Sequence, residues 1–449
     1  MRRTLYRIYR WMFSFTVWRR RKFTTAGLFT LVLLGASAAV GVDTTLAMVY
    51  QIFSFLFVLF VLSLLMSRRF QGNISIKRHL PRFATTQQRF VYHIDIKNQG
   101  TRPQSNLCLF EDTADPRPSF DEFIEIPEPS NMSKNPVDRF FGFLKWLWLI
   151  DNKKGARFDK IDIPLLRPQE SQRVRVELLP IRRGRIRLSG LTLAGPDPFG
   201  MCRALHSYAI PESVLVLPKR YSLPPINLPG VRKHHSGGIV LALSVGDSEE
   251  FVALREYRPG DPLRRIHWKS WAKIGKPIVK EYQEEFFVRH VLLLDTFADH
   301  GFAEEFEEAV SLAASFACTV LTQESLLDLI FVGPEVYCFT SGRGLGQTDK
   351  ILEVLASVVP CRDKSFESLF PSVLARAPYI SGCICIFLHW DENRQKLVQM
   401  LRQFNLPLLV LVVIDKNEAK KLDPGIMSDL PENFQVLRSG HIEEDLQLL

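Results

Sequence analysis

The sequence has few of the features that usually reveal chemistry. Its seven cysteines are an odd and scattered set, and no spacing among them matches a zinc site. Cys383 and Cys385 are separated by one residue on an expected strand, and we predict that their side chains face opposite ways and make a poor metal pair. Reduced, buried thiols are therefore expected, as in a protein of a reducing compartment.

Catalytic arrangements are also lacking. No Ser/His/Asp or Cys/His pattern is visible, and no candidate base has an evident orienting partner. The glycine-rich segment 341–346 follows an expected edge hairpin, so it does not match a phosphate-binding loop. We therefore predict a protein that is not an enzyme and that has no cofactor.

Acidic residues are nearly absent from the start of the chain. Residues 1–69 hold ten Lys/Arg and one acid, Asp43, so their net charge equals the +9 of the whole chain. Because the remainder is balanced, nucleic acid is not an expected partner. Residues 1–22 interleave basic with aromatic residues and contain no acid. This composition is typical of a segment at a membrane surface, and a basic disordered tail is the alternative.

Two long runs without charge follow this basic segment. Residues 23–42 and 44–67 are twenty and twenty-four residues long, enough for helices of roughly 30 and 36 Å that cross a bilayer. Basic residues precede the first run and follow the second, which places both ends in the cytoplasm. We therefore predict a transmembrane helical hairpin over 23–67 in the cytoplasmic (inner) membrane. This multi-pass anchor would leave both termini and the soluble domains in the cytoplasm.

The soluble part changes its periodicity along the chain. Residues 70–220 show short alternating strands separated by turns, which predicts an all-β Ig-like sandwich. An apolar segment, 137–150, interrupts it and suits a membrane interface, a partner groove or a helix packed on the sandwich. Residues 221–250 form a Pro/Gly/Ser-rich connector. In 283–449 strands alternate with helices, which predicts a doubly wound α/β domain.

The segment 251–282 between these domains is the most unusual. It carries eight Lys/Arg against three acids, and its pattern predicts a strand, a turn, a helix and a second strand. Asp261 before Pro262 favours a helix start, with the helix running to about Lys273 and Gly275 beyond its end. Its charges are either solvated or paired on an amphipathic helix, or they are presented to an acidic partner or an anion.

The segment contains, in order, Arg255-Glu-Tyr257, Gly260-Asp261, Ile266 and Trp268-Lys269. This order resembles the signature of the family known as domain of unknown function fifty-eight, although His267 stands where the family often has Asp. The resemblance implies a protein partner, because such proteins are commonly encoded beside MoxR-type AAA+ ATPases. The candidate residues for binding a partner or an anion are Arg255, Glu256, Tyr257, Arg258, Gly260, Asp261, Arg265, Trp268 and Lys269.

The α/β domain resembles von Willebrand factor A-like domains, whose metal site lies at the carboxyl ends of strands. Asp295, Asp299 and Asp391 are the weak candidates for metal ligands here. Phe297 and Asp299 stand where such a site has serines, so a vestigial site is expected, with a divalent cation as the alternative.

Together these features predict a membrane-anchored cytoplasmic scaffold or adaptor. It would act with a MoxR-type AAA+ ATPase in protein assembly or remodelling. The alternative is an anion- or divalent-metal-dependent enzyme, or a binder of anionic ligands, that uses the basic segment 251–282.

Overall fold

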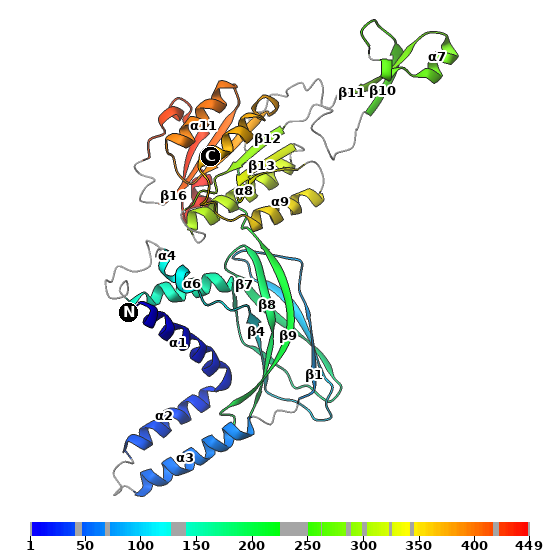
Figure 1. The fold of residues 1–449 in the computed structure, drawn as a ribbon. Coiled ribbons are helices and arrows are strands. Elements are labelled where there is room, and N and C mark those ends of the chain that lie inside the picture. The colour runs from blue at the N-terminus through cyan, green and yellow to red at the C-terminus, as the bar shows by residue number, and fades with distance from the viewer. Residues whose placement is uncertain are drawn as a thin grey trace. The chain divides into compact units, whose positions relative to one another are not determined.

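The chain folds into two compact units. The first contains residues 1–220, 298–314 and 352–360, and the second contains 221–297, 315–351 and 361–449. The computed structural model shown in Figure 1 describes residues 2–40, 47–67, 72–126, 141–224, 250–261, 263–283, 289–298, 303–322, 326–341, 345–415 and 422–447.

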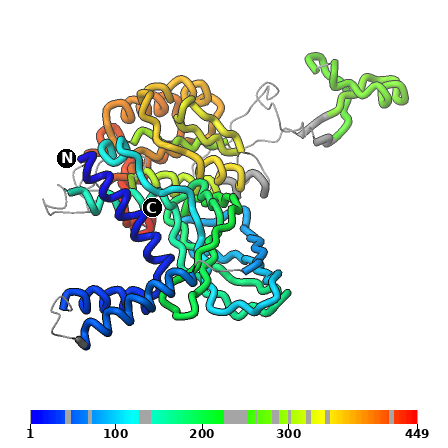
Figure 2. The backbone as a smooth tube through the Cα atoms, turned by 60° about the horizontal axis from the view of Figure 1, so that its bottom comes forward, coloured from blue at the N-terminus to red at the C-terminus, as the bar shows by residue number. Residues whose placement is uncertain are grey.

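Three helices open the first unit, and both views draw them in blue (Figures 1 and 2). They are α1 (Arg2–Lys22), α2 (Thr25–Val40) and α3 (Ala47–Met66). Within α3, Met48–Met66 has a mean hydropathy of 2.4 and is long and apolar enough to cross a membrane. The 16 residues of α2 are apolar but fall short of a ~30 Å hydrocarbon layer at about 1.5 Å per residue. The described residues thus hold one candidate span, and Asp43 of the expected outer turn lies outside them.

Two β-sheets follow in the first unit. The four-stranded sheet has the order β1-β3-β7-β5, and the five-stranded sheet has the order β2-β9-β8-β4-β6. Side chains alternate along β3, so that Tyr92, Ile94 and Ile96 enter a core that both sheets share. The strands are β1 (Ile74–His79), β2 (Phe83–Thr85), β3 (Phe90–Asn98), β4 (Leu107–Thr113), β5 (Ala156–Phe158), β6 (Ile161–Ile163), β7 (Ser171–Pro180), β8 (Gly184–Pro196) and β9 (Arg203–Leu217).

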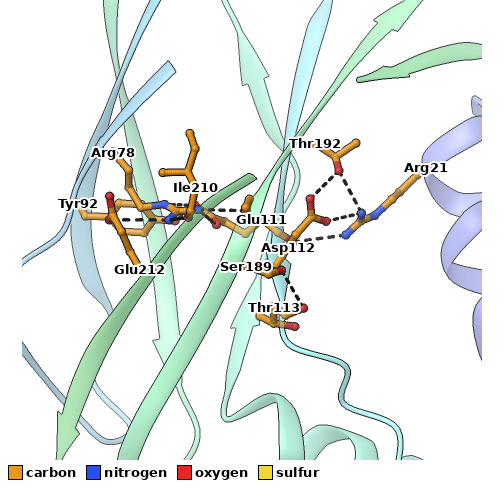
Figure 3. Close-up of polar contacts among 11 residues, drawn as sticks. Arg21, Arg78, Tyr92, Glu111, Asp112, Thr113, Ser189, Thr192, Ile210 and Glu212 are labelled. Carbon is orange, nitrogen blue, oxygen red and sulfur yellow. Dashed lines mark hydrogen bonds and ion pairs between the residues drawn. The ribbon is translucent and has the colours of Figure 1, made fainter. Parts of the chain in front are cut away.

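A buried charge pair lies inside this β-sheet core (Figure 3). Arg78 Nη2 donates to Glu111 Oε2 at 2.8 Å, and the Tyr92 hydroxyl donates to Glu111 Oε1. Two backbone carbonyls, those of Ile210 and Gly190, accept from the same guanidinium at 3.0 and 3.1 Å. These contacts give hydrogen-bond partners to both the carboxylate and the guanidinium. The core can therefore hold this charge pair without exposing either group to water.

The inserted apolar segment packs against the N-terminal helix. It contributes α6 (Phe143–Lys154), which follows the short helix α4 (Phe120–Glu125); residues 127–140 lie outside the described part. Trp146, Leu149 and Ile150 of α6 are buried in a cluster that also contains Tyr9 of α1. The buried side chains of this insert thus lie against α1 and α4, whereas the sequence left open a membrane interface, a partner groove or a helix packed on the sandwich.

A six-stranded sheet forms the body of the second unit, in the order β14-β13-β12-β15-β16-β17. All neighbours are parallel except the edge strand β14. Every residue of β15 and β16 is buried, as expected for a parallel sheet covered on both faces. The strands of this sheet and the helices that follow them are β12 (Arg289–Leu294), α8 (Glu304–Thr322), β13 (Leu326–Val332), β14 (Val336–Ser341), α9 (Leu345–Ser357), α10 (Phe370–Leu374), β15 (Gly382–Phe387), α11 (Glu392–Gln403), β16 (Leu408–Ile414), β17 (Phe434–Arg438) and α13 (Ile442–Leu446). Residues 304–314 of α8 and 352–357 of α9 are counted in the first unit.

One prediction about this sheet is wrong. Cys383 and Cys385 do not face opposite ways on β15, because their Sγ atoms lie 3.6 Å apart within the same core. Side chains on a strand repeat with a period of two, so residues i and i+2 share a face. Both thiols are buried and free. The contact with Cys383 raises the pKa of Cys385, and burial raises it further.

Candidate functional site

The signature segment forms a small arm with its own antiparallel ribbon. β10 (Glu250–Glu256) pairs with β11 (Ile278–Gln283), and the 3₁₀-helix η1 (Leu263–Arg265) and the helix α7 (Trp268–Ile274) lie between them. A bridge joins Ile266 to Val279, and the side chains of both are buried together with that of Ile278. Among the arm residues whose burial is described, these three aliphatic side chains are the buried ones, so most of the others lie at the surface.

An ion pair closes the turn of the arm. Arg255 donates from Nη1 and Nη2 to the two oxygens of Asp261 at 2.7 and 2.8 Å, and the backbone N–H of Arg258 donates to Asp261 Oδ2 at 2.8 Å. The bond from Arg255, followed by that from Arg258, lowers the pKa of Asp261 to about 2. Gly260 adopts φ +108°, a conformation that a residue with a Cβ rarely takes. Arg255 and Asp261 therefore hold the turn itself.

The predicted helix start at Asp261 is wrong. Its carboxylate is engaged by Arg255 and the Arg258 N–H, and η1 follows as a separate short turn. α7 begins only at Trp268, where His267 occupies the N-cap position without a side-chain cap bond. The end of α7 lies where we expected it, because Gly275 has φ +75° and donates its N–H to the Trp271 carbonyl at 2.9 Å.

The outside of the arm combines exposed apolar side chains with basic ones. Trp268, Leu263 and Ile274 are 65, 67 and 59% exposed, and the Trp268 ring stacks on Trp271 at a centroid distance of 5.3 Å. We call this set, with its neighbouring exposed cations, the arm surface. It consists of Leu263, Trp268 and Ile274 together with Arg258, Arg264, Lys269 and Lys273.

The structure divides the predicted binding residues into two groups. Arg255, Gly260 and Asp261 build the turn, and the Tyr257 N–H donates to the Pro277 carbonyl at 3.0 Å. Glu256 pairs with Lys276 at 3.2 Å on the surface, and Arg265 is half-buried. Arg258, Trp268 and Lys269 are exposed and lie outside the ion pair that closes the turn.

Sequence reasoning missed Leu263 and Ile274 as surface residues. The pattern predicted one continuous helix from Asp261 to about Lys273, but the break between η1 and α7 interrupts the helical period. A signal was present, since the arm has too few residues on either strand to bury a helix's whole apolar side.

A second cluster lies where β12 ends. Asp295 is fully buried, and Arg394 donates to its Oδ2 from Nη2 at 2.8 Å and from Nε at 2.9 Å. The N–H groups of Phe297 and Leu388 also donate to Asp295, at 3.0 and 3.2 Å. The Arg394 guanidinium stacks over the Phe366 ring at 4.5 Å, which fixes its plane.

Asp391 joins this cluster from the start of α11. Its Oδ1 accepts the Arg394 N–H at 3.0 Å as the helix N-cap, and its Oδ2 pairs with Arg394 Nη1 at 2.5 Å. The structure thus brings Asp295 and Asp391 together, but around one guanidinium; Asp299 lies outside the described residues. Within the described part of the chain, no group of three His, Cys, Asp or Glu side chains is placed to hold a metal ion. In the described residues, Asp295 and Asp391 are therefore engaged by the guanidinium of Arg394.

Comparison with known proteins finds one family whose model begins in the arm and ends beyond α9. The family model described as "Protein of unknown function DUF58" matches residues 253–365. An uncharacterized protein, YeaD, of Bacillus subtilis (strain 168) is 24% identical over 197 residues. That match covers 43% of this chain and 47% of YeaD, so it spans less than half of the relative's length.

Similarity to solved structures is low. The CARDB domain of a Pyrococcus furiosus protein, solved with di-metal ions, has 9% identity and a TM-score of 0.18, with 32% of this chain and 93% of that chain covered. The ASH/PapD-like domain of human CEP192 has 13% identity and a TM-score of 0.18, with 32% and 86% covered. Neither likeness carries an argument about fold or function. The family resemblance predicted from the signature is confirmed, because the DUF58 family model matches residues 253–365.

Proposed function

We propose that this chain is a membrane-anchored adaptor that captures a protein partner with the arm surface. The observation that carries the proposal is the exposure of Trp268, Leu263 and Ile274 beside Arg and Lys side chains. Exposed apolar groups of this kind mark interaction sites, and Trp and Arg dominate the energy of protein interfaces. The ion pair between Arg255 and Asp261 keeps the turn rigid, which reduces the ordering cost of binding.

The rest of the chain supplies the anchor and the frame in this proposal. The apolar helix α3, with α2 as its partner, supports a transmembrane hairpin in the inner membrane with the soluble domains in the cytoplasm. Two sheets on a shared core support an Ig-like sandwich for residues 70–220. The mostly parallel six-stranded sheet supports a von Willebrand factor A-like domain for residues 283–449.

The partner that we propose is an AAA+ ATPase of the MoxR type. The family resemblance implies this class of partner, and the exposed cations of the arm surface suit an acidic surface on it. No covalent chemistry is required of the chain in this role, because the ATPase would supply the energy.

The test is a crosslinking pull-down on the full-length protein in detergent, with and without ATP. The arm variant combines Trp268→Ala with Lys269→Glu, two exposed positions outside the turn. The matched control is Lys396→Glu, an exposed cation on α11 that receives the same change of charge. Arg255 is left intact, because its loss would open the turn.

We expect the wild type and the control to recover an AAA+ ATPase. The arm variant should bind it about 30-fold more weakly, the effect of losing one ~2 kcal/mol hot spot. Equal recovery by the arm variant would remove the arm surface from the proposal. Recovery of no ATPase by the wild type under either nucleotide condition would overturn the adaptor role.

A further inference from the structure

Helix α1 has one face that is already packed. Tyr9 is buried against Trp146 of α6 with a ring-centroid distance of 6.1 Å, and its hydroxyl donates to the Phe141 carbonyl at 3.0 Å. Tyr6 packs edge-on against Trp146 at 5.4 Å, and its hydroxyl donates to the Pro118 carbonyl at 3.0 Å. These contacts fix the rotation of α1 about its own axis.

The last turn of α1 is also held. Arg21 Nη1 pairs with Asp112 Oδ1 at 2.5 Å, and Nη2 donates to the Glu111 carbonyl at 3.3 Å. Figure 3 shows Arg21 reaching from its helix to Asp112 and Thr192 on the strands of the sheet. Next to it, Lys22 Nζ donates to Ser67 Oγ at 2.8 Å, just beyond the end of α3. α1 is therefore positioned before it meets any further surface.

The other face of α1 carries an apolar stripe that the described protein leaves uncovered. Its members recur with the helical spacing i, i+3, i+4, i+7 and i+10, and each is between 41 and 65% exposed. We call them the outer stripe: Ile8, Trp11, Met12, Phe15 and Trp18. An exposed apolar patch of this size on a helix whose opposite side is packed needs an occupant.

Ring contacts connect the outer stripe to the candidate membrane span. Trp11 stacks on Phe15 at 5.4 Å, and Phe15 meets Trp18 at 5.9 Å. Trp18 then contacts Phe23 at 5.4 Å, and Phe23 stacks on Phe60 of α3 at 5.9 Å. The stripe is thus continuous with the helix that is apolar enough to cross a membrane.

The charges of α1 favour an anionic lipid surface over an apolar protein groove. The helix contains eight Lys or Arg and no acidic residue, with four of the cations in its last turn. Basic residues beside an aromatic stripe are the composition of helices that lie in the headgroup region. Cations near such a surface are attracted to anionic lipid.

We infer that α1 lies in the plane of an anionic bilayer surface, with the outer stripe inserted at the boundary between headgroups and acyl chains. The helix would then be held between lipid on one side and the helices α4 and α6 on the other. Arg21 and its bond to Asp112 would transmit this position to the β-sheet. This inference rests on the membrane anchor of the proposed function and adds a second, peripheral contact to it.

The test places a photoreactive benzoylphenylalanine at single positions of the full-length protein in lipid nanodiscs that contain phosphatidylglycerol. Position 15 lies in the outer stripe, and position 14 is its neighbour outside the stripe, where Arg117 Nη1 donates to Ser14 Oγ at 2.9 Å. Position 55 reports the span, because Phe55 is exposed on α3. We expect lipid adducts from positions 15 and 55, at least fivefold above position 14.

The outcomes separate the two ideas. Lipid adducts at position 55 without adducts at position 15 would overturn the surface position of α1 and leave the anchor standing. Adducts at neither position would overturn both. Nanodiscs of phosphatidylcholine alone should lower the yield at position 15 several-fold and leave position 55 unchanged; an unchanged yield at position 15 would contradict the choice of an anionic surface.

Discussion

Arg394 is the counter-charge of two carboxylates near the end of β12 in the second unit. Its guanidinium neutralises the fully buried Asp295 and also pairs with Asp391. Replacing Arg394 with Met leaves a buried carboxylate without its counter-charge, which costs about 3–5 kcal/mol. Asp391→Asn, at a carboxylate that is 47% exposed, should cost about 1 kcal/mol or less because Asn can still cap α11. Urea unfolding of the two variants measures both losses.

A metal titration tests whether a cation can bind in place of Arg394. Because the guanidinium occupies the space between the two carboxylates, millimolar Mg²⁺ or Mn²⁺ should leave the melting temperature of the wild type unchanged. A rise in melting temperature with either ion, abolished in Asp295→Asn, would show that a cation binds in place of Arg394.

Contacts between individual side chains were the hardest feature to predict from the sequence. Arg78, Tyr92 and Glu111 meet in the first unit's core although they lie on three different strands. Burial raises the pKa of Glu111, although the nearby Arg78 guanidinium acts to lower it. Which effect is larger depends on the distances between these groups. The same holds for Arg394, which sequence reasoning did not single out, because its partner Asp295 is 99 residues away.

The stability of the arm's turn is expected to depend on pH. The pKa of Asp261 is lowered to about 2 in the folded arm, against an ordinary value of 3.8, through its bonds to Arg255 and Arg258. A carboxyl group with a lowered pKa stabilises the fold above its ordinary value, and this contribution is lost as the pH falls from about 4 toward 2. The turn should therefore stay closed at pH 5 and open near pH 2.

The stacked pair Trp268 and Trp271 offers a local signal for this opening. Its exciton band in circular dichroism should fall between pH 4 and pH 2 in the wild type, after subtraction of the same titration for Asp261→Asn. The Asn variant keeps the shape but lacks the charge, so it should show a weaker band already at pH 7 with no further step from this group. Identical titrations of the two proteins would refute the role of the ion pair.

At the scale of elements, the sequence predicted the strands and the end of α7 well and the start of α7 badly. Gly275 has one strong conformational preference, so its position marks the helix end directly. Asp261 has several possible acceptor roles, and which one is used depends on whether a partner such as Arg255 is within reach. Local signals with one physical outcome can be predicted, whereas those decided by a tertiary contact cannot.

At the scale of the whole molecule, periodicity was informative because it reports burial on one or both faces. The alternation along β3 matches a strand buried on one face, and the continuous apolar run of β16 matches a strand buried on both faces. Strand order does not follow from such patterns, and neither does the choice of a neighbour. The packing of α6 against α1, for example, joins segments more than a hundred residues apart that had been open to three interpretations.

The two units have separate hydrophobic cores, and this separation leads to a prediction for the whole molecule. Ile94 belongs to the core of the two sheets in the first unit, and Leu293 belongs to the core beside the six-stranded sheet in the second. Both side chains are fully buried, so Ile94→Ala and Leu293→Ala should each cost about 2–5 kcal/mol of unfolding free energy. At about 2–4 °C per kcal/mol for units of this size, each should lower one melting transition by roughly 4–20 °C. Since neither core contains residues of the other unit, calorimetry of the full-length protein in detergent should resolve two transitions, with each variant shifting its own.

A single transition that both variants lower equally would mean that the units unfold as one cooperative body. The energetic boundary would then not follow the boundary between the cores.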